Sequence, residues 1–193
     1  MSSAARDIRN LTIWEFDDFV EADQSGREFE LIDGELVMMS NPTEAHEQIA
    51  GNIGAPLKLA MNKRGCRTYQ GGMRVQANDD KSGRDSYKPD VLVRCGPRDD
   101  KKTYVTDPVV IVEVLSPSTM DKDRGKKLEF YKTLPSVRHI VLVYSDQMRV
   151  EHYTCGNDGW KDPAPLTYPD ETLNLEAVEF SLGMEEIYFD LPF

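Results

Sequence analysis

The sequence predicts an α/β protein in which a mixed β-sheet core is flanked by helices and preceded by an N-terminal β-hairpin. Two strand-like segments meet at Asp33-Gly34, and apolar residues then recur at helical spacing over residues 45–60. Further along, short runs rich in Val and Ile alternate with a second helix-like stretch. With 193 residues, 39% of them hydrophobic, the chain suits one substantial core. We expect a flexible leader at residues 1–10 and a single domain over residues 11–193.

The first predicted elements are a short helix and a hairpin. Thr12 or Asp17 can begin the helix, since Ser, Thr, Asp and Asn are favoured as N-caps. Residues 28–32 and 35–39 flank an Asp-Gly pair, which is the strongest short-range signal for a tight turn between antiparallel strands. We therefore expect two paired strands directly after the first helix.

A longer helix is expected after the hairpin. Asn41 and Pro42 suit its N-cap and its first helical position, because proline lacks the N–H that this position leaves unbonded. Apolar side chains then recur every three or four residues and so share one face of the helix; they are Ala45, Ile49, Ile53, Leu57 and Ala60. The pattern predicts an amphipathic helix.

The rest of the chain predicts strands on both sides of a second helix. Ser118 and Asp121 have the spacing of a capping box for that helix. The order strand, helix, strand predicts a right-handed crossover between parallel strands. The predicted elements are strands at 66–70, 72–77, 89–93 and 109–114, a helix that includes 123–131 and ends at Leu134-Pro135, paired strands at 138–144 and 148–154, a strand-like tail at 173–180, and a short helix near 184–188.

The charge and the cysteines narrow the class of protein. A formal net charge of −11 argues against broad non-specific adhesion to nucleic acid or anionic lipid, although a local basic groove remains compatible with it. No stretch approaches the ~20 apolar residues of a membrane span, so we expect a cytoplasmic protein. Cys66, Cys95 and Cys155 lack the paired short spacing of zinc or redox sites, and we expect reduced thiols without a role.

Two acidic residues lie beside strands rich in Val and Ile. Asp90 precedes one such run and Glu113 lies inside another. A carboxylate in a buried strand is costly unless a cation, a proton or good hydrogen bonds compensate, so the pair suggests a cation site. Asp123, Lys127 and Tyr131 are spaced four apart and so share one helical face, from which a lysine can approach the acids. The alternative is an ordinary ion pair between Glu113 and Lys127, with Asp90 merely ending a loop.

Taken together, five segments in order resemble the Uma2 family of restriction-endonuclease-like proteins in the PD-(D/E)XK nuclease superfamily. They are residues 30–36 (ELIDGEL), His46, residues 89–91 (PDV), residues 112–118 (VEVLSPS) and residues 123–131 (DRGKKLEFY). The likeness runs from about Phe16 to residues 185–188. It implies a restriction-endonuclease-like fold and a Mg²⁺-dependent or Mn²⁺-dependent endonuclease, which hydrolyses DNA phosphodiester bonds with metal-activated water and no covalent intermediate.

The resemblance also implies the site residues. Asp90 and Glu113 would bind the metal, together with the main-chain carbonyl of Val114. Leu115 stands where the superfamily pattern has a lysine, which is a departure. In the family that this chain resembles, the lysine comes instead from the following helix, at the position of Lys127. A homodimer is expected, because two active sites suit the symmetry of a DNA duplex.

Other residues are weaker candidates for the site. Glu30, His46 and Tyr131 are auxiliary candidates: an extra acid, a substrate contact, and a hydroxyl that hydrogen-bonds an active-site acid. Glu35 is expected to face solvent. His139 begins an apolar strand and His152 lies in an alternating one, with no spacing that joins either to a metal cluster, so we interpret both as structural.

Two other functions fit the same sequence. One is a nucleic-acid or protein interaction module that keeps the fold but cleaves weakly or not at all, which the strong acidity of the chain favours. The other is a metal-dependent hydrolase of a smaller phosphorylated compound. Metal binding and DNA cleavage separate these alternatives from the nuclease.

Overall fold

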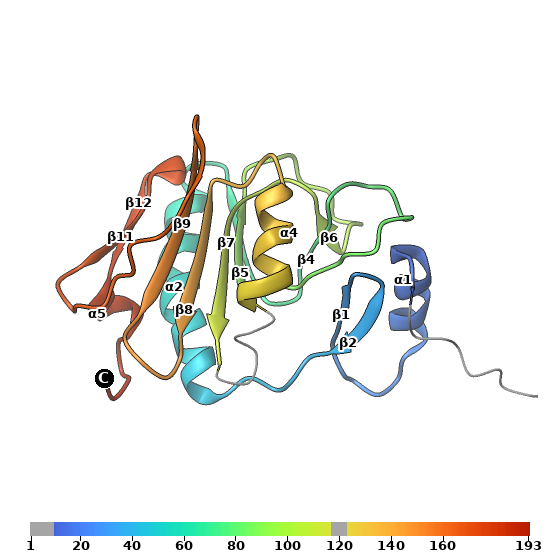
Figure 1. The fold of residues 1–193 in the computed structure, drawn as a ribbon, viewed down its shortest axis with the longest axis horizontal. Helices are drawn as coiled ribbons and strands as arrows, with labels where there is room; N and C mark the ends of the chain where they lie inside the picture. The colour runs from blue at the N-terminus through green and yellow to red at the C-terminus, as the bar shows by residue number, and fades with distance from the viewer. Residues whose placement is uncertain (1–9, 117–122) are drawn as a thin grey trace, which may run out of the picture.

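The computed structural model describes residues 10–116 and 123–193, and it contains a six-stranded mixed sheet. Figure 1 shows this sheet at the centre of the molecule, with α2 behind it and α4 in front. The strand order is β10-β9-β8-β7-β5-β3, in which β7 and β8 are parallel and the other neighbours are antiparallel. These strands are β3 (Arg67–Gln70), β5 (Val91–Arg94), β7 (Pro108–Leu115), β8 (His139–Tyr144), β9 (Val150–Gly156) and β10 (Gly159–Lys161). The predicted mixed α/β fold is therefore confirmed.

The N-terminal elements form a separate lobe beside the sheet, at the right of Figure 1. Helix α1 (Ile13–Ala22) begins after Thr12, which forms a capping box with Glu15. Strands β1 (Phe29–Ile32) and β2 (Glu35–Met38) pair antiparallel. The connecting residues both have positive φ, 53° at Asp33 and 78° at Gly34, as a tight hairpin turn requires. The predicted hairpin is confirmed.

Helix α2 (Glu44–Asn62) covers one face of the sheet. Its N-cap is Thr43, whose hydroxyl accepts a hydrogen bond from the His46 N–H, so the predicted start at Asn41 and Pro42 is wrong by two residues. The helix begins where the Thr43 hydroxyl caps it, and not at the proline that precedes this residue. Ile49, Ile53 and Leu57 are buried against the sheet, which confirms the predicted apolar face.

The opposite face of the sheet is covered by α4 (Leu128–Thr133). A π-helical turn, η1 (Asp123–Lys127), precedes it, and Gly125 in that turn departs from helical geometry, so the predicted helix is interrupted there. The helix ends at Leu134, as predicted. Its Leu128 and Tyr131 are buried in the core on this side of the sheet. The predicted capping box of Ser118 and Asp121 lies outside the described residues.

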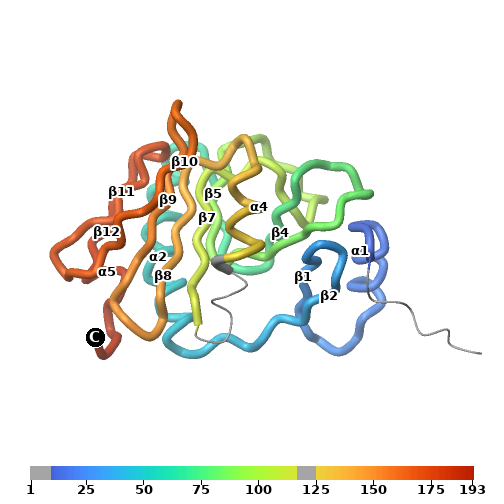
Figure 2. Tube along the Cα trace, viewed as in Figure 1, coloured from blue at the N-terminus to red at the C-terminus, as the bar shows by residue number. Residues whose placement is uncertain are grey.

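The remaining elements are short. The predicted strand over 72–77 is reduced to β4, and the predicted tail strand is a hairpin whose two strands are joined by a single 3₁₀ turn. They are β4 (Arg74–Val75), β6 (Tyr104–Val105), β11 (Thr172–Leu175), η2 (Glu176–Val178), β12 (Phe180–Gly183) and α5 (Met184–Ile187). Figure 2 follows the chain from α1 at one end of the long axis to the C-terminus at the other. None of the described helices is long and apolar enough to cross a membrane.

A disulfide joins Cys66 and Cys95, so the expectation of reduced thiols is wrong for these two residues, while Cys155 is free. The cause lies in the pairing of β3 with β5, in which Arg67 lies opposite Arg94. Cys66 directly precedes Arg67 and Cys95 directly follows Arg94. Because the strands are antiparallel, the two cysteines face each other one position beyond this pair. The bond ties the two strands together at the end of β5 that lies away from Asp90.

Loss of this disulfide is expected to destabilise the fold. The bond closes a loop with a sequence separation of 29 residues. In the chain-entropy account, such a cross-link stabilises the folded state by at most about 3–4 kcal/mol. Urea denaturation of Cys66→Ser/Cys95→Ser is expected to show a free energy of unfolding lowered by up to that amount. Cys155→Ser is the matched control, and an equal stability of all three proteins would contradict the prediction.

Candidate active site

Asp90 lies immediately before β5, where this strand and β7 no longer pair. Its Oδ2 accepts a hydrogen bond of 2.7 Å from the main-chain N–H of Val114. The same oxygen lies 3.2 Å from Nε2 of His46, near the start of α2. The Asp90 side chain is 18% exposed, so it lies at the end of the sheet rather than in the core. Two separate elements thus hold this carboxylate.

Glu113 extends from β7 toward α4. Its neighbours Val112 and Val114 belong to the core on the α2 side, while Ile111 and Leu115 belong to the core on the α4 side. Because side chains alternate along a strand, Glu113 lies on the α4 side with Ile111 and Leu115. The residue is only 3% exposed. The hydroxyl of Tyr131, on α4, donates a hydrogen bond of 2.7 Å to Oε1 of Glu113.

Lys127 joins Glu113 to the N-terminal hairpin. Its Nζ lies 3.3 Å from Oε1 of Glu113 and 2.9 Å from Oε1 of Glu30, which is on β1. All three side chains are less than a tenth exposed. The main-chain N–H of Lys88 also donates to Oε1 of Glu30, at 2.8 Å. One buried ammonium therefore bridges two buried carboxylates from different parts of the chain.

Three aromatic rings pack against one another next to Glu113. The ring of Tyr87 lies 4.8 Å from that of Phe130 and 5.8 Å from that of Tyr131. Burial, and then the nearby Asp85 carboxylate, raise the pKa of Tyr87 well above its ordinary value, so its hydroxyl stays protonated and donates to Asp85. Such packing excludes water from the ion pairs and strengthens their electrostatic interaction.

The seven residues that the sequence singled out for the site lie in two connected groups, around Asp90 and around Glu113. Asp90 is in contact with His46 and with the main chain of Val114, next to Glu113, and Glu113 is joined to Lys127 and Tyr131. Glu30 also reaches the site, whereas Glu35 is exposed, as expected. The side chain of Asp123 is not described.

Sequence reasoning missed the main-chain donors that orient the acids. The N–H groups of Lys88 and Val114 hold Glu30 and Asp90, and no side-chain pattern reports such groups. For the Val114 N–H, the sequence offers one indication, which is that Val114 directly follows Glu113.

The donor set fits a hard divalent cation. Asp90 and Glu113 supply carboxylates, and the described residues give Oδ1 of Asp90 no hydrogen bond. The N–H and C=O of one strand residue face the same side, so the carbonyl of Val114 faces the same edge of β7 as the N–H that binds Asp90. Within residues 10–116 and 123–193 there is no group of three or more His, Cys, Asp or Glu side chains in a metal-binding arrangement. Mg²⁺ accepts one or two carboxylates and keeps several waters.

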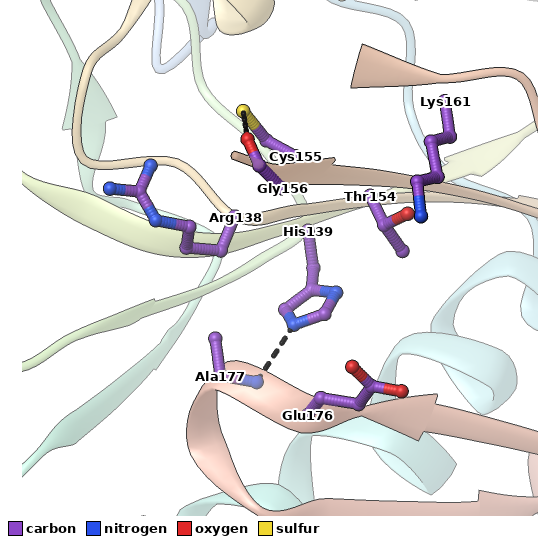
Figure 3. A pocket seen from close by; sticks show the side chains of 8 residues that line it. All are labelled: Arg138, His139, Thr154, Cys155, Gly156, Lys161, Glu176 and Ala177. Carbon is purple, nitrogen blue, oxygen red and sulfur yellow. Dashed lines mark hydrogen bonds between the residues drawn. The ribbon is translucent and has the colours of Figure 1, made fainter. Parts of the chain in front are cut away.

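A pocket of about 350 Å³ lies at the other end of the sheet (Figure 3). It is distant from Asp90 and Glu113, because His139 at the start of β8 pairs with Val110 near the start of β7. Figure 3 shows the His139 ring extending toward Ala177 of η2. Most of the residues around it are exposed, so we do not assign the active site there; they are Arg138, His139, Thr154, Cys155, Gly156, Lys161, Glu176 and Ala177.

His139 and His152 form a pair of neutral rings. Nε2 of His139 accepts a hydrogen bond from the Ala177 N–H at 3.0 Å, so its proton is on Nδ1, which lies 2.9 Å from Nε2 of His152. A second proton on either ring would break one of these bonds. Burial lowers the pKa of both histidines to about 4. The geometry agrees with the expectation that both are structural.

The chain is similar to one family of proteins and to two uncharacterized relatives. A family model described as "Uma2: Putative restriction endonuclease" matches residues 15–185. An uncharacterized protein of Synechocystis sp. (strain ATCC 27184 / PCC 6803 / Kazusa) is 29% identical over 181 residues, 92% of this chain and 92% of that protein. A second uncharacterized Synechocystis protein is 30% identical over 134 residues, 68% of this chain and 74% of that protein.

A solved structure shares the fold. It is the crystal structure of "a putative nuclease belonging to DUF820" from Anabaena variabilis ATCC 29413, with a TM-score of 0.74, covering 92% of this chain and 97% of that chain. The sequence identity is 17%, so this likeness shows the fold alone.

The His139–His152 pair is expected to make the fold less stable in acid. Both rings are neutral in the folded chain and take up protons on unfolding below about pH 6.5, so the free energy of unfolding falls as the pH drops from 6.5 toward 4. Allowing for partial solvent screening, we expect about 1 kcal/mol per pH unit from the pair. In chemical denaturation, His139→Asn/His152→Asn is expected to show a shallower pH dependence over this range. An unchanged slope would contradict the assignment of neutral rings.

Removing the ammonium between two buried acids is expected to be costly. Lys127→Met leaves Glu30 and Glu113 without their shared cation, and breaking a buried ion pair by deleting one partner costs about 3–5 kcal/mol. Thermal and urea unfolding should show this loss. Lys127→Met/Glu30→Gln should recover part of it, because one buried charge is removed as well.

The matched control for this experiment is Lys126→Met. The Lys126 side chain is 60% exposed and pairs only loosely with Asp33, so a change below about 0.5 kcal/mol is expected. Equal effects of the two substitutions would show that the Lys127 bridge does not exist in solution.

Proposed function

Because this chain belongs to the Uma2 family, we propose that it is a divalent-metal-dependent endonuclease that hydrolyses DNA phosphodiester bonds. The observation that supports the proposal lies at the end of β7, where Asp90 accepts the N–H of Val114 and the adjacent Glu113 pairs with the Lys127 ammonium. An isolated structural ion pair would need neither Asp90 nor its bond to Val114. The coarser conclusion, a restriction-endonuclease-like nuclease, agrees with the family and with the fold.

The residues divide into two roles in this proposal. Asp90, Glu113 and the Val114 carbonyl would hold Mg²⁺ or Mn²⁺, which polarises the phosphate and activates water when it is bound. The bond from the Val114 N–H aligns the Asp90 carboxylate before any ligand arrives. His46 contacts the same carboxylate from α2 and restricts its rotation. These contacts organise the acids in advance, which lowers the cost of reorganisation during the reaction.

Lys127 would orient the attacking water and offset the negative charge that develops on the phosphate. Its ammonium is held on the Glu113 side of the site by two carboxylates, so the cation is positioned without being exposed to solvent. The hydroxyl of Tyr131 fixes the Glu113 carboxylate from α4. In this arrangement Lys127, the last residue of η1, takes over the task of the lysine that the superfamily pattern places at Leu115.

The substrate and the assembly are part of the same proposal. A net charge of −11 opposes the approach of DNA, so binding requires local cations and a metal at the site. Two active sites suit the symmetry of a DNA duplex, and we propose a homodimer that acts on DNA in the cytoplasm. Light scattering tests the dimer independently of activity.

The direct test is cleavage of plasmid DNA with Mg²⁺ or Mn²⁺. The wild-type protein should cut the plasmid, while Asp90→Asn, Glu113→Gln and Lys127→Ala should each reduce the rate by about 100-fold or more, since each removes a preorganised charge from the site. Calorimetric Mn²⁺ binding should weaken in Asp90→Asn and Glu113→Gln.

Lys126→Ala is the control for the lysine, because it changes the adjacent residue on the exposed side. It should cut at the rate of the wild type. DNA binding without cleavage under either metal would favour the interaction module. Metal binding unchanged in both acid variants would remove Asp90 and Glu113 from the metal site.

A further inference from the structure

A second buried carboxylate lies on the same face of the sheet as Glu113. The strand register places Glu113 opposite Leu142 on β8, and Leu142 opposite Glu151 on β9. Directly opposite residues on neighbouring strands point to the same face. Glu113 and Glu151 are therefore two strands apart, which corresponds to about 10 Å between their Cα atoms. Glu151 is only 1% exposed, and the proposed nuclease mechanism does not use it.

Glu151 holds one arginine. Nε and Nη2 of Arg149 lie 3.2 Å and 2.9 Å from Oε1 of Glu151, and Tyr144 and Tyr153 donate their hydroxyls to the same carboxylate. The Arg149 guanidinium also lies over the Tyr144 ring, 5.3 Å from its centroid. A buried charge is expensive to maintain, and an apolar residue would often be at least as stable there. The arrangement fixes the conformation of Arg149.

The backbone of Arg149 is fixed as well. The N–H of Arg149 donates to the Tyr188 hydroxyl at 3.0 Å, and that hydroxyl lies 2.7 Å from the Arg149 carbonyl and 3.1 Å from the Tyr144 carbonyl. Burial raises the pKa of Tyr188 above its ordinary value, so the hydroxyl keeps the proton that it donates. The turn between β8 and β9 is thereby anchored to the C-terminal part of the chain.

The guanidinium nevertheless reaches solvent at the same end of the sheet as the candidate active site. Arg149 is 33% exposed, while its partner Glu151 is 2% exposed at the side chain. Tyr144, beside Arg149, lies opposite Leu115 at the end of β7. Figure 1 shows the end of β7, the start of α4 and the β8–β9 turn along the same lower edge of the molecule. The hydrogen bonds from Arg149 to Glu151 use Nε and Nη2 of the guanidinium.

From this geometry we propose that Arg149, held by Glu151, binds a backbone phosphate of the nucleic acid that flanks the phosphate in the active site. This inference rests on the proposed function. Phosphates advance about 3.4 Å per nucleotide along the axis of one DNA strand, and the Cα atoms of Glu113 and Glu151 are about 10 Å apart, so the phosphate that Arg149 binds would be a few nucleotides from the one in the active site. A guanidinium whose rotamer is already fixed loses little entropy on binding a phosphate. Arg149 is thus a substrate-positioning residue.

The test compares DNA affinity and its salt dependence. Arg149→Gln alone would leave the Glu151 charge buried, so the double variant Arg149→Gln/Glu151→Gln is used, and circular dichroism checks its fold. In fluorescence anisotropy with a labelled DNA duplex, the double variant should bind about 10-fold more weakly, with a salt slope smaller by about one. The same titration with an RNA duplex shows whether the contact serves both backbones.

Arg138→Gln is the matched control. Arg138 is an exposed arginine at the opposite end of the same strand pair, where its Nη1 donates to the main-chain carbonyls of Pro135 and Val137. Its substitution should leave the affinity and the salt slope unchanged. Hydrolysis of bis(4-nitrophenyl) phosphate, which is too small to reach Arg149 from the active site, should also be unchanged in the double variant, while the KM for DNA rises.

The outcomes separate this inference from the nuclease proposal. If the wild type cuts DNA but the double variant binds DNA with unchanged affinity and slope, the Arg149 contact is wrong and the nuclease stands. If the wild type binds DNA without cutting it, the nuclease proposal fails, and a loss of affinity in the double variant still supports the contact. If the wild type does not bind DNA, both are overturned.

Discussion

The interaction on which the site depends is the pairing of Lys127 with Glu30 and Glu113. A buried ammonium is unfavourable unless its charge is compensated, and here two carboxylates compensate it, at 2.9 Å and 3.3 Å. Each acid alone would be equally unfavourable. The three residues are therefore stable only together, and they connect the N-terminal hairpin, the central strand β7 and the start of α4 into one unit. The same buried charges that belong to the candidate site also hold these three parts of the fold together.

The sheet supplies the rest of the geometry. The antiparallel pairing of β5 with β7 begins at Val91, directly after Asp90, and the Asp90 carboxylate accepts the N–H of Val114 beyond the last paired residue of β7. The parallel pair β7 and β8 then places Tyr144 opposite Leu115, next to the end of β7, and β9 returns with Arg149 beside Tyr144. This end of the sheet therefore carries the acidic residues Asp90 and Glu113 and the basic residues Lys127 and Arg149. Local cations of this kind can attract a polyanion to a chain of negative net charge.

Much of the fold follows from local patterns. The Asp33-Gly34 turn, the apolar face of α2 and the parallel pair around α4 each depend on neighbouring residues or on the handedness of a crossover, and each was predictable. The start of α2 was misplaced because the Thr43 hydroxyl outcompetes the Asn41-Pro42 signal. The disulfide was missed because Cys66 and Cys95 become neighbours only through the register of β3 against β5, which no spacing reports. For the same reason, sequence could nominate Glu30 but not its contact with Lys127.

The central claim is that Asp90, Glu113 and the Val114 carbonyl form one metal site beside Lys127. Anomalous diffraction from a crystal soaked in Mn²⁺ tests it most directly, because the signal locates the ion without reference to activity. The account predicts an anomalous peak within about 2.0–2.5 Å of oxygens from Asp90, Glu113 and Val114, with Lys127 still in contact with Glu30. A peak elsewhere, or none at saturating Mn²⁺, would contradict it.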